Sequence, residues 1–215
     1  MRDQYHREIN YIRISLTDRC NLKCKYCRPD FSSKLAHSDI LTYEEILRLC
    51  QGLVKLGIKR FKLTGGEPLL RKDSVAFLQR LKALDGVEQV TLTTNGTMLR
   101  EQLPSLKTIG IDGINISLDS CDAKTYAEIT GNDCLEEVLA AIEEAYALGL
   151  PVKINCVPLN NMQAADLLAM VELVKNRNIP LRFIELMPLS CNSELQGISG
   201  EAIREMFGEA GIKLL

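Results

Sequence analysis

The chain has 215 residues, of which 46% are hydrophobic and 25% charged, values typical of a globular domain with a substantial core. Its 26 Lys and Arg residues nearly balance its 28 Asp and Glu residues, so the net charge of −2 gives no electrostatic reason to expect binding to nucleic acid or to an anionic membrane. The first ten residues are polar and no apolar run approaches the length of a membrane span. We therefore expect a cytoplasmic protein without a signal peptide or a transmembrane helix.

Strand-like and helix-like segments alternate six times along the chain. Strands are expected at residues 11–17, 60–63, 88–93, 113–118, 152–157 and 181–186. Helices are expected from Thr42, where Glu45 completes a capping-box spacing, to Gly57, and then at about 73–84, 99–109, 122–130, 135–148, 163–177 and 200–210. The alternation predicts an α/β fold with a parallel sheet and right-handed crossovers, in one domain over residues 1–215.

Five of the six predicted strands carry polar side chains on one face and apolar side chains on the other, whereas parallel strands covered on both faces are apolar throughout. This pattern predicts a partial (βα)6 TIM-like barrel of parallel strands with outer helices, in which the polar rows line the inside. For any single polar residue, the alternative is a charged side chain inside the barrel that is satisfied by a protein partner. The repetition over five strands favours an anionic ligand instead, and phosphate suits the cations Arg13, Lys62 and Lys153. The polar rows comprise Arg13, Ser15, Thr17, Arg60, Lys62, Thr64, Thr91, Thr93, Asn95, Asn115, Ser117, Asp119, Lys153 and Asn155.

Three cysteines, Cys20, Cys24 and Cys27, lie within eight residues directly after the first predicted strand. Thiolates this close in sequence favour a soft metal centre, and three of them favour an iron–sulfur cubane in which one iron has no protein ligand. A zinc site that recruits His37 as its fourth ligand is the alternative, although the spacing is loose for a closed zinc finger. The odd number of cysteines and the expected cytosolic location argue against disulfides.

The second predicted strand runs into Thr64-Gly65-Gly66-Glu67-Pro68. Active sites of α/β barrels lie at the C-terminal ends of the strands, paired glycines allow a backbone to approach a ligand closely, and Glu67 adds a carboxylate near the expected cluster. By itself, this segment is also typical of an ordinary turn before a helix.

The pattern C-x-x-x-C-x-x-C, with an aromatic residue before its last cysteine and a Gly-Gly-Glu segment about forty residues later, resembles the radical S-adenosylmethionine (SAM) family. Further segments resemble, in their order, the GTP 3′,8-cyclase family, which opens molybdenum cofactor biosynthesis: YIRISLTDRCNLKCKYCRPD, FKLTGGEPLLRKD, LTTNGTML, GINISLDS, VKINCVPL and LRFIELMPL. The resemblance implies a lyase that uses a [4Fe–4S] cluster and SAM to convert GTP to 3′,8-cyclo-7,8-dihydro-GTP. In that family a 5′-deoxyadenosyl radical removes the ribose C3′ hydrogen of GTP, and C3′ then attacks C8 of guanine.

The resemblance also assigns individual residues to these ligands. Cys20, Cys24 and Cys27 match the ligands of the cluster; Tyr26, Gly66, Ser117 and Met187 match positions that contact SAM; Arg13, Lys62, Thr93 and Lys153 match positions that contact GTP. Lys62 stands where the family often has arginine, which keeps the charge and loses bidentate phosphate geometry. The implied partners are GTP and an electron-donor protein, without nucleic acid or membrane, and a homodimer is left open.

The sequence departs from the family at its C-terminal end. Full-length members continue with a second cubane, bound by a C-x-x-C pair and a later cysteine, and Cys191 alone cannot form it. We therefore expect the N-terminal part of a longer enzyme, with two alternatives: a radical SAM enzyme acting on another small molecule or a peptide, and a zinc-stabilised domain without enzyme activity. The remaining cysteines are expected to be small buried side chains, namely Cys50, Cys121, Cys134, Cys156 and Cys191.

Overall fold

The computed structural model describes residues 2–27, 35–188 and 192–212. The chain divides into two compact units. Unit 1 comprises Met1–Asn21, Ser33–Ile116 and Glu137–Val152, and unit 2 comprises Leu22–Ser32, Ser117–Glu136 and Lys153–Leu215. The expected single domain over residues 1–215 therefore stays a prediction.

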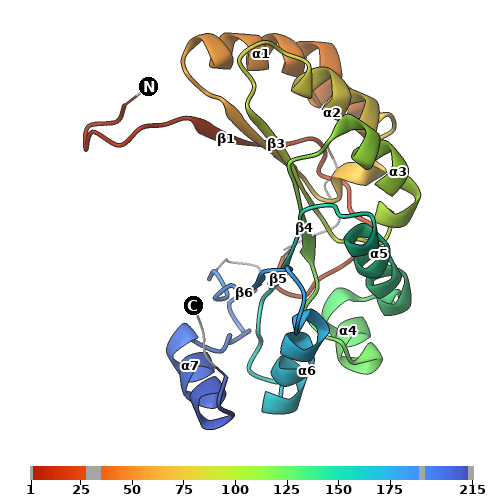
Figure 1. Cartoon of the computed structure of the whole chain (residues 1–215), viewed down its shortest axis with the longest axis vertical. Coiled ribbons are helices and arrows are strands. Elements are labelled where there is room, and N and C mark those ends of the chain that lie inside the picture. The colour runs from red at the N-terminus through yellow and green to blue at the C-terminus, as the bar shows by residue number, and fades with distance from the viewer. Residues whose placement is uncertain (1, 28–34, 189–191, 213–215) are drawn as a thin grey trace. The chain divides into compact units, whose positions relative to one another are not determined.

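Six strands form one sheet in which they follow one another in chain order (Figure 1). They are β1 (Tyr11–Ser15), β2 (Arg60–Thr64), β3 (Gln89–Thr94), β4 (Gly113–Ser117), β5 (Val152–Cys156) and β6 (Leu181–Phe183). The pairs β1–β2, β2–β3, β3–β4 and β5–β6 are parallel. The α/β class and the parallel sheet predicted from the sequence are confirmed.

Seven helices lie in the described part of the chain, and each overlaps a predicted one. They are α1 (Tyr43–Lys55), α2 (Ser74–Lys82), α3 (Leu99–Ile109), α4 (Ala123–Thr130), α5 (Leu135–Ala147), α6 (Ala164–Val174) and α7 (Gly200–Glu209). Two short 3₁₀ turns were not predicted from the sequence, namely η1 (His37–Asp39) and η2 (Pro68–Leu70). In unit 1, α1, α2 and α3 lie along the same side of the strands (Figure 1).

The ends of α1 follow the local signals that predicted them. The backbone N–H of Glu45 donates to the Thr42 hydroxyl at 3.2 Å, and the Glu45 carboxylate accepts from the Thr42 backbone N–H at 2.7 Å, which completes a capping box. Gly57, with φ of 95°, supplies the left-handed conformation directly after the helix.

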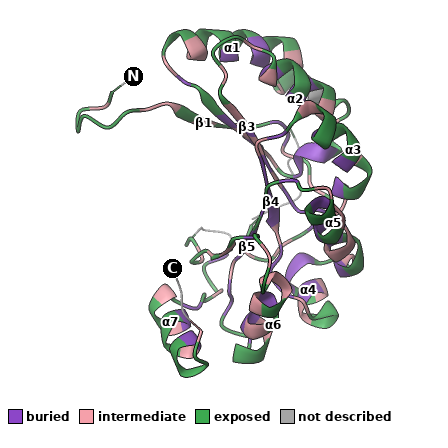
Figure 2. Cartoon of the chain, viewed as in Figure 1, coloured by how far each residue is buried: buried purple, intermediate pink, exposed green. Residues whose placement is uncertain are grey.

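The two faces of the strands in unit 1 differ in burial as the sequence predicted. The apolar row of β2, β3 and β4 is almost fully buried, as Figure 2 shows in purple, and it includes Phe61, Leu63, Val90, Leu92 and Ile114, whereas that of β1 is half-buried. The opposite row is more open, because Arg13 and Ser15 are exposed and Lys62 is half-buried. Packing against the helices therefore uses only one face of these strands, which leaves the polar face available for a ligand.

No helix in the described ranges is both long and apolar enough to cross a membrane.

Candidate active site

In unit 1, the chain that leads to Cys20 runs beside the Gly-Gly-Glu segment. After β1 and β2 end, the backbone N–H of Gly66 donates to the Thr17 carbonyl and that of Glu67 donates to the Arg19 carbonyl, both at 2.7 Å. A Cβ on Gly66 would lie 2.2 Å from the Arg19 carbonyl oxygen, and one on Gly65 would lie 2.6 Å from that of Thr17. The glycines are therefore required for the close approach of two backbone segments, and this approach fixes the residues just before Cys20.

Glu67 is fully buried, and its carboxylate faces the C-terminal end of β3. One oxygen accepts hydrogen bonds from the backbone N–H of Leu69 and from the Thr94 hydroxyl, both at 2.9 Å. The other oxygen accepts from the backbone N–H of Asn95 at 2.7 Å. Burial raises the pKa of the carboxyl, while these three hydrogen bonds oppose the shift. The side chain thus ties the Gly-Gly-Glu turn to the end of the third strand.

Asn95 joins the end of β3 to the segment that contains Cys20. Its amide nitrogen lies 3.8 Å from the Cys20 sulfur and donates to the Asn21 side-chain oxygen at 2.8 Å. Its amide oxygen accepts from the backbone N–H of Thr97 at 3.0 Å, which fixes the orientation of the amide. An N–H group beside a cysteine sulfur favours the thiolate and lowers the charge density on a sulfur that ligates iron.

In unit 2, the segment from Lys23 to Cys27 runs along the C-terminal end of α4. The backbone N–H groups of Lys23 and Lys25 donate to the carbonyls of Thr130 and Ile129 at 2.7 and 2.9 Å. The N–H of Cys27 donates to the carbonyl of Cys24 at 3.0 Å and closes a turn between the two cysteines. Cys24 is half-buried and Cys27 is exposed, so both sulfurs lie within reach of a ligand.

Tyr26 is held at its hydroxyl and at its carbonyl. The hydroxyl donates to Oδ2 of Asp119 at 2.7 Å, and Oδ1 of Asp119 accepts from the backbone N–H of Val157 at 2.8 Å. The amide nitrogen of Asn192 donates to the Tyr26 carbonyl at 2.9 Å and to the Met187 carbonyl at 3.1 Å. Burial raises the pKa of Asp119 to about 6. The pKa of Tyr26 is raised well above its usual value, first by burial and then by the nearby charge of Asp119.

The three predicted cluster ligands fit an iron–sulfur cluster in residue type and accessibility. Each is a thiol rather than half of a disulfide, and each is half-buried or exposed. Cys20 belongs to unit 1, and Cys24 and Cys27 belong to unit 2. Within the described ranges, no set of three or more His, Cys, Asp or Glu side chains is gathered into a metal-binding group, so their assignment as ligands stays a prediction. The side chain of His37, the alternative zinc ligand, lies outside the described residues.

Arg13 and Lys62 of the predicted nucleotide site lie side by side in unit 1. The register of the sheet places Arg13 opposite Lys62 and Lys62 opposite Thr91 on the neighbouring strand. Thr93, two residues further along β3, lies opposite Asn115 on β4 and is half-buried. Two cations on adjacent strands, with hydroxyl groups beside them, form a surface suited to phosphate oxygens.

The remaining predicted contacts belong to unit 2, which also holds Arg182, a cation that was not predicted from the sequence. Lys153 on β5 is exposed, Ser117 at the end of β4 is half-buried, and Met187 after β6 is 68% exposed. Arg182 on β6 is exposed and lies opposite Asn155 on β5. The sequence signal for Arg182 is a single cation between two apolar residues in the last strand.

The side-chain oxygen of Asn155 is buried and finds no hydrogen-bond partner among the described residues. An amide oxygen in this position costs free energy unless a ligand or water supplies a donor. This feature marks the polar face of β5 and β6 as a place where a ligand would gain a hydrogen bond.

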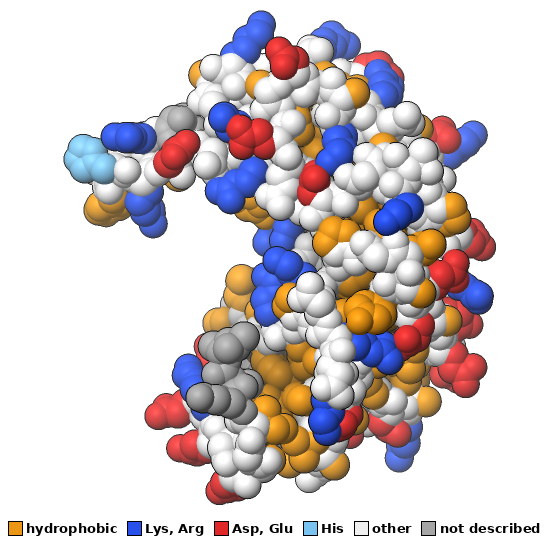
Figure 3. All heavy atoms as spheres, in the orientation of Figure 1, with side chains coloured by type: hydrophobic (Ala, Val, Ile, Leu, Met, Phe, Trp, Pro, Cys, Tyr) orange, Lys and Arg blue, Asp and Glu red, His pale blue; other side chains and the backbone are white. Residues whose placement is uncertain are grey.

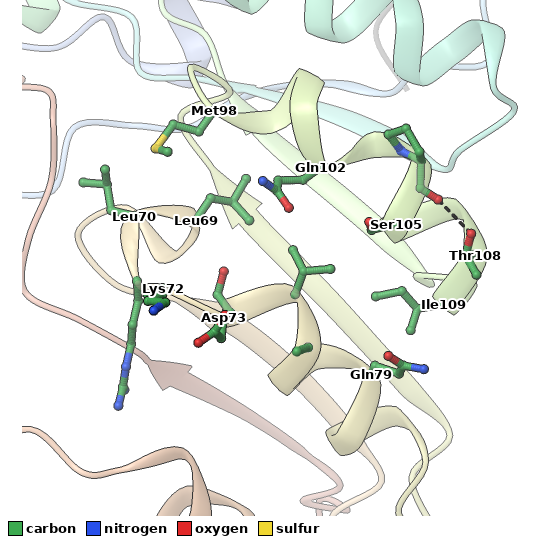
Figure 4. Close-up of a pocket in the computed structure, with 15 residues that line it drawn as sticks. Leu69, Leu70, Lys72, Asp73, Gln79, Met98, Gln102, Ser105, Thr108 and Ile109 are labelled. Carbon is green, nitrogen blue, oxygen red and sulfur yellow. Dashed lines mark hydrogen bonds between the residues drawn. The ribbon is translucent and has the colours of Figure 1, made fainter.

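A cavity of about 690 Å³ lies elsewhere in unit 1, between α2 and α3 (Figure 4). Its labelled polar side chains come from α2, from the two residues before it and from one face of α3, and they include Asp73, Gln102 and Thr108. None of the predicted site residues lines it. The candidate site is therefore distinct from this cavity.

The cysteines outside the triplet differ in burial. Cys50 and Cys156 are buried, as predicted, and burial raises the pKa of Cys50 to about 11. Cys121 and Cys134 are half-buried, with the Cys121 sulfur 3.4 Å from the Met170 sulfur and the Cys134 sulfur 3.6 Å from the Tyr126 hydroxyl. Cys191 lies outside the described residues.

Comparison with known proteins places these features in a family. The sequence model of the Radical SAM superfamily matches residues 14–174. The GTP 3′,8-cyclases of Peptoclostridium acidaminophilum and Geobacter sulfurreducens are 44% and 43% identical over 90% and 92% of the chain. The chain spans about 60% of the length of these curated relatives.

Solved structures show the same fold at low sequence identity. Streptococcus suis SuiB bound to S-adenosylmethionine has a TM-score of 0.78 and 16% identity, covering 94% of this chain and 47% of that one. The anSMEcpe protein with bound AdoMet and a peptide has a TM-score of 0.66 and 19% identity, covering 82% of this chain and 51% of that one. These likenesses confirm the predicted fold class, a partial (βα)6 TIM-like barrel.

Because the family model covers most of the chain and includes the cysteine triplet, the chain belongs to the radical SAM superfamily.

Proposed function

We propose that this chain is the radical SAM part of a GTP 3′,8-cyclase, a lyase that converts GTP to 3′,8-cyclo-7,8-dihydro-GTP in molybdenum cofactor biosynthesis. One observation carries the proposal: curated relatives with that name, from several organisms, are 39–44% identical to about nine-tenths of the chain. Since the chain spans about 60% of those relatives, the activity of the whole enzyme, its substrate and its partners are inferred.

Membership in the superfamily implies a [4Fe–4S] cluster and SAM as cofactors. The cluster would be held by the three cysteines of the triplet, and the amide of Asn95 would lie beside the sulfur of Cys20. SAM would be contacted by Tyr26, Gly66, Ser117 and Met187. When bound, these cofactors supply a one-electron cleavage that gives the family its radical chemistry.

GTP would be bound through its phosphates by the cations of the polar face. Arg13 offers a bidentate guanidinium, and Lys62, its neighbour across the sheet, offers a point charge. Lys153 and Thr93 would complete the contacts. The task of these residues is to bind and orient the nucleotide, because an error of about 1 Å in the position of the ribose is enough to lose much of the rate.

The expected partners of the proposed enzyme are an electron-donor protein and, in a homodimer, a second copy of the chain. The proposal places the enzyme in the cytoplasm, without nucleic acid or membrane as a partner. Charge of both signs is spread over the outer helices α1 to α3 on the face in Figure 3, which supports this choice, because nucleic-acid-binding surfaces are predominantly basic.

The cluster assignment is tested by anaerobic reconstitution followed by iron and sulfide analysis. We expect about four iron and four sulfide per chain, whereas a structural zinc site would give about one zinc and no sulfide. Cys24→Ala should lower the iron content and abolish formation of 5′-deoxyadenosine from SAM. The matched control is Cys121→Ala, which removes a half-buried thiol outside the triplet and should change neither result. Full SAM cleavage by Cys24→Ala at normal cluster content would disprove the assignment.

The substrate assignment is tested by calorimetric titration of the reconstituted protein with GTP. Lys62→Ala should weaken binding by about 1.5–3 kcal/mol, the range for losing a hydrogen bond to a charged group. The control is Lys59→Ala, three residues before Lys62 in the sequence. It removes an exposed lysine that pairs with Glu88 at 2.6 Å and should leave GTP binding unchanged. Equal affinities for the two variants would show that the polar face does not bind the phosphates.

A further inference from the structure

Two buried polar side chains in unit 2 contact Tyr26 without belonging to any of the proposed ligand sets. Asp119 and Asn192 are each 3% exposed. They lie 93 and 166 residues from Tyr26 in the sequence, in the segment after β4 and in the segment after β6. A buried polar side chain is retained where its hydrogen bonds do something that an apolar side chain cannot do.

Asp119 uses both carboxylate oxygens to tie Tyr26 to the strand ends. Oδ2 accepts from the Tyr26 hydroxyl at 2.7 Å, and Oδ1 accepts from the backbone N–H of Val157, one residue after the end of β5, at 2.8 Å. The carboxylate thereby bridges a side chain of the cysteine loop and a backbone group of the sheet. A single amide oxygen, as in asparagine, cannot accept both hydrogen bonds in the same geometry.

Asn192 joins the same loop to the segment that contains Met187. Its Nδ2 donates to the carbonyl of Tyr26 at 2.9 Å and to the carbonyl of Met187 at 3.1 Å. A side-chain amide supplies the two N–H groups that this position needs, whereas a carboxylate of the same shape would face two carbonyl oxygens with no proton to offer. The contact therefore couples the position of the cysteine loop to that of a predicted SAM-binding segment.

Because Tyr26 lies between Cys24 and Cys27, its contacts with Asp119 and Asn192 affect the positions of both cysteines. Tyr26 immediately precedes Cys27 and follows Cys24 by two residues, and its carbonyl belongs to the peptide bond that leads into Cys27. The backbone bonds of Lys23 and Lys25 to α4 fix the start of the loop, and the two side-chain contacts fix its end. Ligands held in a single arrangement bind a metal centre more tightly than ligands that must be ordered on binding.

We propose that Asp119 and Asn192 are positioning residues that hold Tyr26, and through it Cys24 and Cys27, in the arrangement that binds the cluster. This role rests on the proposed function, because it requires a cluster on the cysteine triplet. The role that we propose for them is to position other residues and requires no contact with the reacting atoms. Their effect is on how firmly the cluster is held and on how its surroundings are ordered.

The test uses the reconstituted chain with four variants and two matched controls. The variants are Asp119→Asn, Asn192→Ala, Tyr26→Phe and the double variant Tyr26→Phe/Asp119→Asn. Asp122→Asn makes the same chemical change three residues away, at the exposed N-cap of α4, and Asn160→Ala removes an exposed amide of unit 2. For each protein, the rate of iron release to a chelator and the electron paramagnetic resonance (EPR) spectrum of the reduced cluster, with and without SAM, are recorded anaerobically. Circular dichroism of the same samples reports folding.

We expect the single variants to load the cluster and to release iron roughly tenfold faster than the wild type. This is the scale of losing one hydrogen bond to a charged group at Tyr26 or Asp119, or two hydrogen bonds to neutral carbonyls at Asn192. Their EPR spectra should broaden, because the cluster would sit in more than one arrangement. The controls should match the wild type. If Asp119 acts through the hydroxyl, adding Asp119→Asn to Tyr26→Phe should change the release rate no further.

Unchanged iron release and unchanged spectra in folded Asp119→Asn and Asn192→Ala would overturn the proposal while leaving the proposed function intact. A wild-type chain that takes up no cluster would instead overturn the proposed function, and this inference with it. If a variant at Asp119 or Asn192 does not fold, Tyr26→Phe decides the role of the Asp119 contact, because it deletes only one hydroxyl. Wild-type behaviour of Tyr26→Phe would then count against the proposal.

Discussion

The Gly65–Glu67 turn of unit 1 and the Cys24–Cys27 turn of unit 2 are held in place by different kinds of contact. The first lies against Thr17 and Arg19 through backbone hydrogen bonds at a separation that leaves no room for a Cβ atom. The second is fixed at its end by the side chains of Asp119 and Asn192. Close backbone approach requires glycine, so the sequence indicates where it occurs. Hydrogen bonds from side chains such as Asp119 and Asn192 use residue types that are common throughout proteins, so the sequence does not indicate them.

The difference has an energetic consequence. A backbone contact at van der Waals limits tolerates no added atom, because neither partner can rotate away. A side-chain hydrogen bond can be lost with less disturbance, because its neighbours can rearrange or accept water. Substitutions in the first turn should therefore act mainly on folding, and substitutions around the second should act mainly on order and on titration.

The largest effect is expected for Gly66→Ala. The added Cβ would lie 2.2 Å from the Arg19 carbonyl oxygen and 2.5 Å from its carbon, so the backbone must move and two hydrogen bonds must lengthen. We expect a loss of about 3 kcal/mol in the free energy of unfolding, the upper part of the usual range for overpacking. Urea denaturation followed by circular dichroism measures it.

The control for this change is Gly52→Ala in α1. No atom lies within 4 Å of a Cβ built at Gly52, and the residue is exposed in the last turn of the helix. Alanine there should stabilise the protein by about 0.5–1 kcal/mol, because glycine is the poorer helix former. Equal effects at the two glycines would contradict the requirement for close backbone approach at Gly66.

A smaller effect is expected for Glu67→Gln. Both carboxylate oxygens accept hydrogen bonds from donors, so the amide group of glutamine must place its own N–H groups against one of them. Leaving that donor unsatisfied should cost about 1–3 kcal/mol in the free energy of unfolding at neutral pH. Glu88→Gln, which alters an exposed ion pair with Lys59, should leave the urea midpoint unchanged. A Glu67→Gln protein as stable as the wild type would show that the carboxylate does not hold the turn.

The signal that is hardest to isolate is a pH dependence, because the chain has 28 acidic residues and many of them titrate over the same pH range. Burial raises the pKa of Asp119 from 3.8 to about 6 in the folded protein. The folded state therefore binds this proton more tightly than the unfolded state, so the resulting stabilisation is full below about 3.8 and is lost as the pH rises through about 6. The stability of the wild type relative to Asp119→Asn should fall over that interval.

Asp122 supplies the opposite sign for comparison. Hydrogen bonds from Thr125 lower its pKa, so its ionised form stabilises the fold and that contribution is lost as the pH falls. The stability of the wild type relative to Asp122→Asn should therefore rise with pH. Urea midpoints measured from about pH 2 to about pH 7 distinguish the two profiles, because the Asp122 contribution changes at and below about pH 4 and the Asp119 contribution changes mainly above it. Parallel profiles for both variants would contradict the burial of the Asp119 charge.

The sequence by itself determined the order of the elements and the residue types of the candidate site. Alternating polar and apolar residues predicted the two faces of β2 and β3, the Thr42 and Glu45 pair predicted the start of α1, and cysteine spacing predicted the family. These signals are local, because a strand face, a helix cap and a ligand triplet each involve residues within a few positions of one another. Boundaries were less certain, as in β6, which ends at Phe183 rather than at residue 186.

Only the tertiary structure decided how the site residues are held. The sequence placed Glu67 near the expected cluster, and the structure turns its carboxylate toward Thr94 and Asn95. It also showed Arg182 opposite Asn155 and brought Asp119 and Asn192 to Tyr26. Contacts between residues this far apart in the chain depend on which strand ends and loops come together on folding. Neither the periodicity of the sequence nor the residue types predict those contacts.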